Sequence, residues 1–175
     1  MDMNYCMQCG ARLERKFHEG EGCEVPWCPA CGAYRYPVFN TAVSMIVLNR
    51  ARDKVLLIRQ YGRPFYVLVA GYVNQKEDAE DAVVREVREE TGLHVESLRF
   101  NRSHYFAPSN TLMLNFTVTV AEETPHANWE VDDWSWFSVD EAQERVKPGS
   151  LARAFLRGYF NGGDYEFPNL TGGRV

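Results

Sequence analysis

The chain has 175 residues, of which 45% are hydrophobic, and it carries a formal net charge of −5 at pH 7. This length accommodates one medium-sized core and a small appendage. The negative charge predicts no nonspecific attraction to nucleic acid or to an anionic membrane surface, so we expect neither as a partner.

Residues 1–38 contain four cysteines in two identical units. These are Cys6, Cys9, Cys28 and Cys31. Each pair is spaced C-x2-C, and the glycine that follows each pair permits a tight backbone turn beneath the sulfur atoms. The pattern predicts a small structural zinc ribbon, in which Zn²⁺ supplies the folding free energy that a segment with few large apolar side chains lacks.

Three other interpretations of these cysteines compete with structural zinc. Two disulfides would require an oxidising compartment. A catalytic zinc ion needs an open ligand position, which four thiolates do not leave. A nucleic-acid-binding ribbon needs a basic surface, whereas residues 1–38 hold four basic and five acidic side chains. We expect a structural or dimer-forming ribbon, with the remaining Cys23 as a free thiol.

The N-terminus also bears on cellular location. Cys6 and Cys9 stand where a signal peptide would need an apolar core. No apolar run approaches the roughly 18 residues that indicate a membrane-spanning helix. We therefore expect a cytoplasmic protein with no membrane partner.

A second domain is predicted over residues 39–175, after Pro37. The apolar segment 41–49 predicts a strand, and a turn leads from it into a second strand at 54–59, so the two form a hairpin. Residues 60–65 are expected to form a polar loop. A short strand at 66–70 then delivers the chain to a glycine, Gly71.

The segment after Gly71 predicts a loop at 71–77 followed by a helix over 78–93. Asp78 is placed to cap the start of the helix, and Gly92 suits a left-handed termination. An apolar stripe typical of a helix that faces a core is formed by Ala79, Ala82 and Val83.

On a helical projection this stripe continues into three carboxylates: Glu86, Glu89 and Glu90. Like charges at this spacing repel by roughly 0.2–0.5 kcal/mol per pair, and the helix dipole disfavours anions near the C-terminus by about 0.3–1 kcal/mol each. A divalent cation reverses both terms, because Mg²⁺ binds carboxylates together with water and phosphate oxygens. The alternative is a solvated face on which Arg85 and Arg88 neutralise the glutamates.

The whole segment resembles the Nudix box. The matching positions are Gly71, then five residues, Glu77, then seven residues, and Arg85, Glu86, Glu89, Glu90, Gly92 and Leu93. The resemblance to Nudix hydrolases implies an α/β fold, an α/β/α sandwich with a mixed sheet, and hydrolysis of a nucleoside diphosphate linked to another group X.

The same resemblance implies roles for individual residues. Glu86 and Glu90 would ligate Mg²⁺ or Mn²⁺, and Glu89 would complete the site as a metal ligand or base. Arg85 with Glu77 would brace the loop that starts at Gly71 against the helix.

The rest of the chain predicts more strands followed by two helices. The strands are expected at residues 95–105, 111–120 and 134–137. Ser138 and Glu141 have the spacing of a capping box that opens a helix at 138–146. Ser150 is placed to cap a final helix that ends at Phe160.

A zinc ribbon ahead of a Nudix domain resembles the NADH pyrophosphatase branch of the family, whose members are homodimers. The motif S-Q-P-W-P-F-P-x-S, followed by Leu-Met, corresponds to residues 103–113, where the flanking serine and Leu-Met agree but the glutamine and most prolines are absent. The resemblance implies a homodimer that converts NAD(H) to AMP and nicotinamide mononucleotide. Hydrolysis of ADP-ribose or of another nucleotide conjugate, and non-catalytic nucleotide sensing, stand as alternatives.

Further site residues follow from the same resemblance. Tyr72 and Phe106 match aromatic positions and would stack on a nicotinamide or adenine ring; the alternative is that both are ordinary core or surface aromatics. His104 replaces the motif glutamine, as a phosphate contact or as a strand-edge histidine. Glu130 opens a segment similar to E-x-x-E-A-x-W-F and would be a further metal ligand or base, unless it is an ordinary loop acid.

Overall fold

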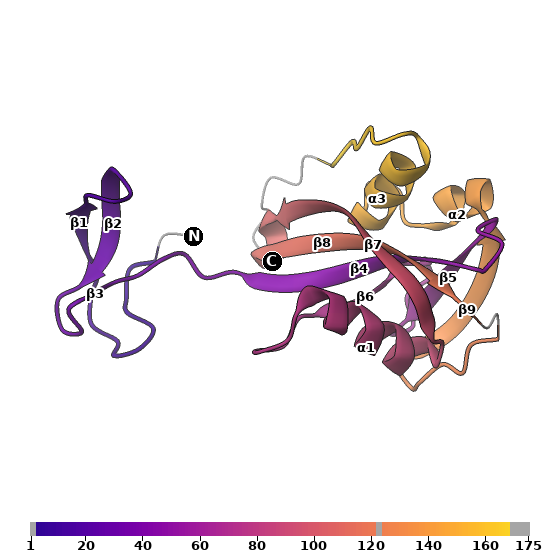
Figure 1. Ribbon diagram of the computed structural model, residues 1–175, viewed down its shortest axis with the longest axis horizontal. Coiled ribbons are helices and arrows are strands. Elements are labelled where there is room, and N and C mark those ends of the chain that lie inside the picture. Colours follow the sequence, from indigo (N-terminus) through magenta and orange to yellow (C-terminus); the bar gives the residue numbers. More distant parts are fainter. Residues whose placement is uncertain (1–2, 122–123, 169–175) are drawn as a thin grey trace. The chain divides into compact units, whose positions relative to one another are not determined.

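The structure is a computed structural model that describes residues 3–121 and 124–168 (Figure 1). The chain divides into two compact units, Met1–Phe39 and Asn40–Val175. Along the described residues, no helix combines the length and the apolar character that a membrane crossing requires.

The first unit is built on a small antiparallel sheet in the order β1-β2-β3. Its strands are β1 (Glu14–His18), β2 (Cys23–Cys28) and β3 (Ala33–Tyr34). The buried apolar residues that the structure describes in this unit are Cys6, Val25 and Cys28. A unit with so little buried apolar area depends on another source of folding free energy.

The second unit contains a mixed sheet, as predicted, in the order β7-β8-β4-β5-β9, with β6 paired to β4. Its strands are β4 (Asn40–Leu48), β5 (Lys54–Gln60), β6 (Val69–Tyr72), β7 (Val95–Phe106), β8 (Thr111–Val120) and β9 (Val131–Ser138). Strand β4 is central and runs parallel to β8, whereas the other named strand pairs are antiparallel.

The edge of β4 that faces away from β8 is divided between two partners. Residues Ala42 to Met45 pair with β6, and only Val47 and Leu48 pair with β5. The predicted hairpin of β4 and β5 is therefore confirmed at its turn, but the two strands separate beyond it. Because β6 occupies the other half of the edge, the end of β5 and the end of β6 open onto the same part of the domain.

Helices cover both faces of this sheet, so the α/β/α arrangement is confirmed (Figure 1). Helix α1 (Ala79–Thr91) packs on the core cluster that contains Val43, Met45 and Val47. Helices α2 (Val139–Arg145) and α3 (Leu151–Phe160) pack on the cluster that contains Ile46 and Leu48. Alternate residues of β4 thus face opposite cores, as expected for a strand buried on both sides.

The predicted helix boundaries hold to within about two residues, but not every cap does. Gly92 adopts φ 71° and its N–H bonds to the carbonyl oxygen of Arg88, as a left-handed stop should. Asp78 occupies the N-cap position of α1, yet its side chain makes no capping hydrogen bond. The capping box of Ser138 with Glu141 and the Ser150 cap are both present.

Two strands differ from their predicted limits because long-range pairing decides them. The short strand predicted at 66–70 lies instead at Val69–Tyr72, since this is the stretch that β4 pairs with, while Tyr66 and Val67 make isolated bridges elsewhere. The last strand starts at Val131 rather than at residue 134, because β5 extends far enough to pair with it.

Candidate functional site

A cleft of about 460 Å³ lies where α1 meets β6 and the end of β5. Three carboxylates line it: Glu86, Glu90 and Glu130. The remaining lining includes Gln60, Tyr61, Tyr72, Asn74, Thr111 and Met113. The cleft therefore combines a strongly acidic region with aromatic and apolar walls.

Glu90 is the most buried of the three acids, with 4% of its surface exposed. One carboxylate oxygen accepts a hydrogen bond from Gln60 Nε2 at 2.9 Å, and the other is buried without a hydrogen-bond partner. Burial raises the pKa of Glu90 to about 7; Glu86 and Glu130 act in the same direction, and hydrogen bonding to Gln60 and to the Ala70 backbone opposes it. A buried anion with an unused oxygen is unfavourable unless a cation approaches it.

Glu86 sits against Gly71, with 13% of its side chain exposed. A Cβ atom at position 71 would lie 2.0 Å from the carboxyl carbon of Glu86 and 2.0 Å from one of its oxygens. A side chain at position 71 would therefore displace the Glu86 carboxylate from its present position, whereas the backbone angle at this glycine plays no part. The Gly71–Glu86 contact explains why these two positions of the box occur together.

Arg85 joins the loop to the helix, in the arrangement that the resemblance implies. It donates from Nε to Glu77 at 2.6 Å and from Nη2 to the Tyr72 carbonyl oxygen at 2.9 Å. The Arg85 guanidinium and the backbone N–H of Asn74 lower the pKa of Glu77 to about 2. Arg85 also contacts Glu86 at 2.6 Å, so one guanidinium links the loop to the acidic lining.

Glu89 does not lie with the other two glutamates of the helix. Its side chain is 57% exposed, contacts Arg85 at 3.1 Å, and is absent from the cleft lining. The predicted shared stripe is therefore wrong for Glu89, because adjacent helical residues point about 100° apart and Glu90 takes the inward direction. Glu89 fits the alternative of a solvated, arginine-neutralised face. Glu86 and Glu90 fit the prediction that carboxylates continue the core-facing stripe.

The loop before β9 is attached to the C-terminal end of α1. The N–H of His126 donates to the Thr91 carbonyl oxygen at 2.7 Å, and that of Asn128 to the Glu90 carbonyl oxygen at 3.3 Å. The Asn128 side chain then accepts from the N–H of Glu130 at 2.9 Å. These bonds use carbonyl groups that a helix end leaves free and place Glu130 at the cleft.

The structure brings only one of the two predicted aromatic residues to the cleft. Tyr72 lines it, but Phe106, at the end of β7, does not. His104 stacks on Phe167, with ring centroids 3.9 Å apart, so its ring packs on the segment that follows α3. Tyr61 also lines the cleft, although the sequence predicts only a polar loop at residues 60–65.

The acidic lining can hold a divalent cation. Carboxylate oxygens are the ligands that Mg²⁺ and Mn²⁺ prefer, and the unpartnered oxygen of Glu90 is a donor that nothing in the described structure uses. Glu86 and Glu130 contribute further oxygens from a different turn of α1 and from the loop before β9. The donor types present therefore suit such an ion.

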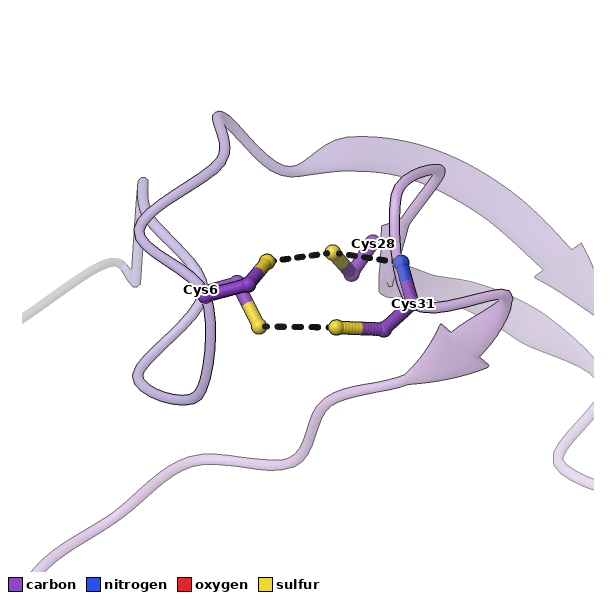
Figure 2. Close-up of side chains that lie close together, drawn as sticks. Cys6, Cys28 and Cys31 are labelled. Carbon is purple, nitrogen blue, oxygen red and sulfur yellow. Dashed lines mark hydrogen bonds between the residues drawn. The ribbon is translucent and has the colours of Figure 1, made fainter.

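The four paired cysteines meet in the first unit (Figure 2). Their sulfur atoms all lie within 4.8 Å of one another; Cys6 and Cys31 are separated by 3.9 Å and Cys9 and Cys28 by 3.5 Å. These separations are near the roughly 3.8 Å expected for thiolates around one tetrahedral ion with metal–sulfur bonds of about 2.3 Å. They are far longer than the roughly 2.05 Å of a disulfide. Cys23 is an exposed free thiol in β2.

Arg35 contacts this cysteine cluster directly. Its Nε donates to Cys6 Sγ at 3.2 Å, and its Nη2 donates to Gln8 at 2.9 Å. A tetrathiolate would carry more negative charge than one divalent ion neutralises, and a fixed guanidinium at this place would offset part of the excess. Sequence spacing gave no signal for Arg35.

Comparison with known proteins identifies related sequences and folds. The sequence model of the NUDIX domain matches residues 38–156. The NAD-capped RNA hydrolase NudC of Pseudomonas aeruginosa is 36% identical over 155 residues, which cover 87% of this chain and 54% of that protein. NudC of Vibrio parahaemolyticus is 29% identical over 157 residues, which cover 88% of this chain and 58% of that protein. The chain thus spans about half the length of the curated relatives it matches.

Among solved structures, a NUDIX hydrolase from Nitrosomonas europaea superposes with a TM-score of 0.63 at 19% sequence identity. The alignment covers 93% of this chain and 96% of that one. At this level of identity the similarity concerns the fold alone.

The burial of Glu90 predicts a specific pH dependence of stability in protein without added Mg²⁺ or Mn²⁺. Below about pH 4.5 this carboxyl is protonated in both folded and unfolded chains; above about pH 7 the folded chain must hold a buried anion. The Glu90 contribution to the free energy of unfolding is therefore lost between these values, by up to about 3 kcal/mol at 1.36 kcal/mol per pKa unit. Urea denaturation measures the free energy of unfolding at pH 5 and at pH 8. Between these two values, the difference between Glu90→Gln and the wild type should shift by about that amount in favour of the variant. The exposed Glu144→Gln should follow the wild type, and an equal pH dependence in all three proteins would contradict the assignment.

Proposed function

Because the chain belongs to the NUDIX domain family, we propose that it hydrolyses the diphosphate of a nucleoside diphosphate linked to another group, with NAD(H) as substrate and AMP and nicotinamide mononucleotide as products. The observation that carries the proposal is the buried carboxylate of Glu90, with an unpartnered oxygen, in a cleft that two further acids line. The choice of NAD(H) is supported by the relatives named NAD-capped RNA hydrolase. A homodimer is proposed on the resemblance to the NADH pyrophosphatase branch, and a cytoplasmic location is proposed as the sequence predicts.

Mg²⁺ or Mn²⁺ is the cofactor we propose for the cleft, with Glu86 and Glu90 as its principal ligands. Such ions neutralise charge that develops on phosphoryl oxygens and lower the pKa of bound water. Gln60 holds one oxygen of Glu90, and Glu90 is one of the residues that line the cleft. Gly71 leaves room for the Glu86 carboxylate, and Arg85 fixes the loop that carries this glycine to the helix.

Glu130 is the residue we propose as acceptor of the proton from the attacking water. The water oxygen forms a bond to phosphorus as the anhydride oxygen departs on the opposite side, and the proton passes to the carboxylate. Glu130 lines the cleft on a loop and forms no ion pair with an arginine of the described residues, whereas Glu89 pairs with Arg85. This geometry favours Glu130 over Glu89, the other residue that the resemblance suggests.

Product analysis tests the proposed reaction. NADH incubated with the protein and Mg²⁺ should yield AMP and the reduced mononucleotide, separable by chromatography, and Glu86→Gln should lose at least 100-fold in turnover because a metal ligand and a charge are both removed. ADP-ribose and an NAD-capped oligonucleotide should be assayed beside it to rank substrates. Tight NADH binding without any product would instead indicate a nucleotide sensor.

If Glu130 accepts the proton, its replacement should lower kcat more than the replacement of Glu89 does. Glu130→Gln should lower kcat by about 100-fold or more, within the range typical of a lost general base. Glu89→Gln should lower kcat by a smaller factor, since its carboxylate lies outside the cleft and pairs with Arg85. The comparison uses kcat at saturating Mg²⁺, with circular dichroism to establish that both variants fold. The opposite order of the two variants would reject Glu130 as the acceptor.

For the cysteine cluster we propose structural Zn²⁺, bound by Cys6, Cys9, Cys28 and Cys31. Four thiolates at tetrahedral separations favour zinc over the hard cations proposed for the cleft. A closed set of four ligands leaves no position for substrate, so the ion would stabilise the unit and take no part in the reaction.

Metal analysis of two cysteine variants tests this proposal. The wild type should carry about one zinc ion per chain, Cys28→Ser should carry almost none, and Cys23→Ser should match the wild type, because Cys23 lies outside the cluster. Chelation should also expose the first unit to limited proteolysis, since metal binding supplies its folding free energy. Equal zinc content in the two variants would be incompatible with the cluster as the binding site.

A further inference from the structure

The turn that follows β5 has an unusual backbone. The pairing with β9 shifts register between Arg59 and Gln60, and the chain then enters the left-handed region at both Tyr61, with φ 56°, and Gly62, with φ 65°. Glycine adopts this region freely, whereas an L-residue with a bulky side chain pays roughly 1–2 kcal/mol. Strain of this kind persists only where the surroundings impose it, and it is concentrated at functional sites.

Two adjacent acids of β9 hold the strained turn in place. The Asp132 carboxylate accepts from the N–H of Gly62 at 2.7 Å. The Asp133 carboxylate accepts from Arg59 at 2.6 Å and from the Tyr66 hydroxyl at 2.9 Å. The segments before, within and after the turn are thus all attached to β9, which imposes the conformation of Tyr61.

The side chain of Tyr61 has no packing role that would explain the strain. It is 60% exposed and belongs to neither core cluster. It lines the cleft instead, beside the acidic residues and together with Tyr72 and Met113. Partial desolvation, followed by the negative charges of Glu130, Glu90 and Glu86, raises the pKa of its hydroxyl. The ring therefore stands at the edge of the region proposed to hold the diphosphate.

We propose that Tyr61 is a specificity-determining residue whose ring stacks on a planar nitrogen heterocycle of the substrate. This inference rests on the proposed function. A diphosphate placed at the carboxylates puts the attached nucleoside rings about one ribose away, where an exposed aromatic face offers the contact that rings prefer. Tyr61 supplies the second aromatic wall, beside Tyr72, that the sequence interpretation assigned to Phe106.

Three variants distinguish the effects of the Tyr61 ring, of its hydroxyl group and of the backbone strain. Tyr61→Asn removes the ring and tolerates the left-handed conformation, because asparagine adopts it more readily than most residues do. Tyr61→Phe keeps the ring and the strain and removes only the hydroxyl. Arg52→Asn is the matched control, since Arg52 has φ 59° in the turn between β4 and β5 and does not line the cleft.

We expect Tyr61→Asn and Arg52→Asn each to raise Tm by roughly 2–4 °C, through relief of the same backbone strain. Only Tyr61→Asn should weaken NADH binding, by about 10-fold in KM and in the Kd measured by NADH fluorescence without added Mg²⁺, with kcat nearly unchanged. Tyr61→Phe should retain wild-type values of all four quantities. The same measurements with ADP-ribose, using displacement of NADH for its Kd, identify the ring: an effect on NADH alone indicates nicotinamide, and an effect on both indicates adenine.

Unchanged Kd and KM in Tyr61→Asn for both ligands would overturn the inference, as would a loss in Tyr61→Phe equal to that in Tyr61→Asn, which would indicate the hydroxyl. A wild type that binds NADH without cleaving it would reject the proposed hydrolysis while the Kd series still decides the role of Tyr61. A wild type that binds neither ligand would reject both.

Discussion

The organisation of the catalytic domain depends on one unfavourable placement, the carboxylate of Glu90 on the side of α1 that packs against the sheet. Burial disfavours its charge, and one of its oxygens has no partner among the described residues. The neighbouring groups either hold this carboxylate, as Gln60 does, or add to its negative field, as Glu86 and Glu130 do. An anion in this position is unfavourable without a proton or a cation beside it, and this is the physical basis of the divalent ion proposed for the cleft.

The box from Gly71 to Leu93 was predictable because its chemistry is local. A helix fixes the relative directions of Arg85, Glu86 and Glu90, and the nearby glycine is needed only to leave space for one of these side chains. Glu89 shows the limit of this reasoning, since a coarse helical stripe does not separate residues 100° apart. The cysteine spacing was equally local, and its sulfurs converge as predicted.

What the sequence did not reveal depends on contacts between distant segments. Tyr61 reaches the cleft because Asp132 holds Gly62 across 70 positions of the chain. Glu130 is placed by hydrogen bonds from its loop to the end of α1, and its prediction came from a resemblance and not from any local pattern. Phe106 satisfied the same kind of resemblance, but the structure places it outside the cleft lining. Pairing between strands, which no short window encodes, decides these positions.

The divided edge of β4 has a consequence for how such a domain can diversify. Strand β6 and helix α1 are fixed by one half of that edge, whereas β5 and the turn beyond it depend on the other half and on β9. Residues of that turn can be exchanged or lengthened during evolution with little effect on the acidic helix, because surface connections tolerate change far better than the elements they join. The domain can therefore keep one reaction while drifting from one group of metabolites to another.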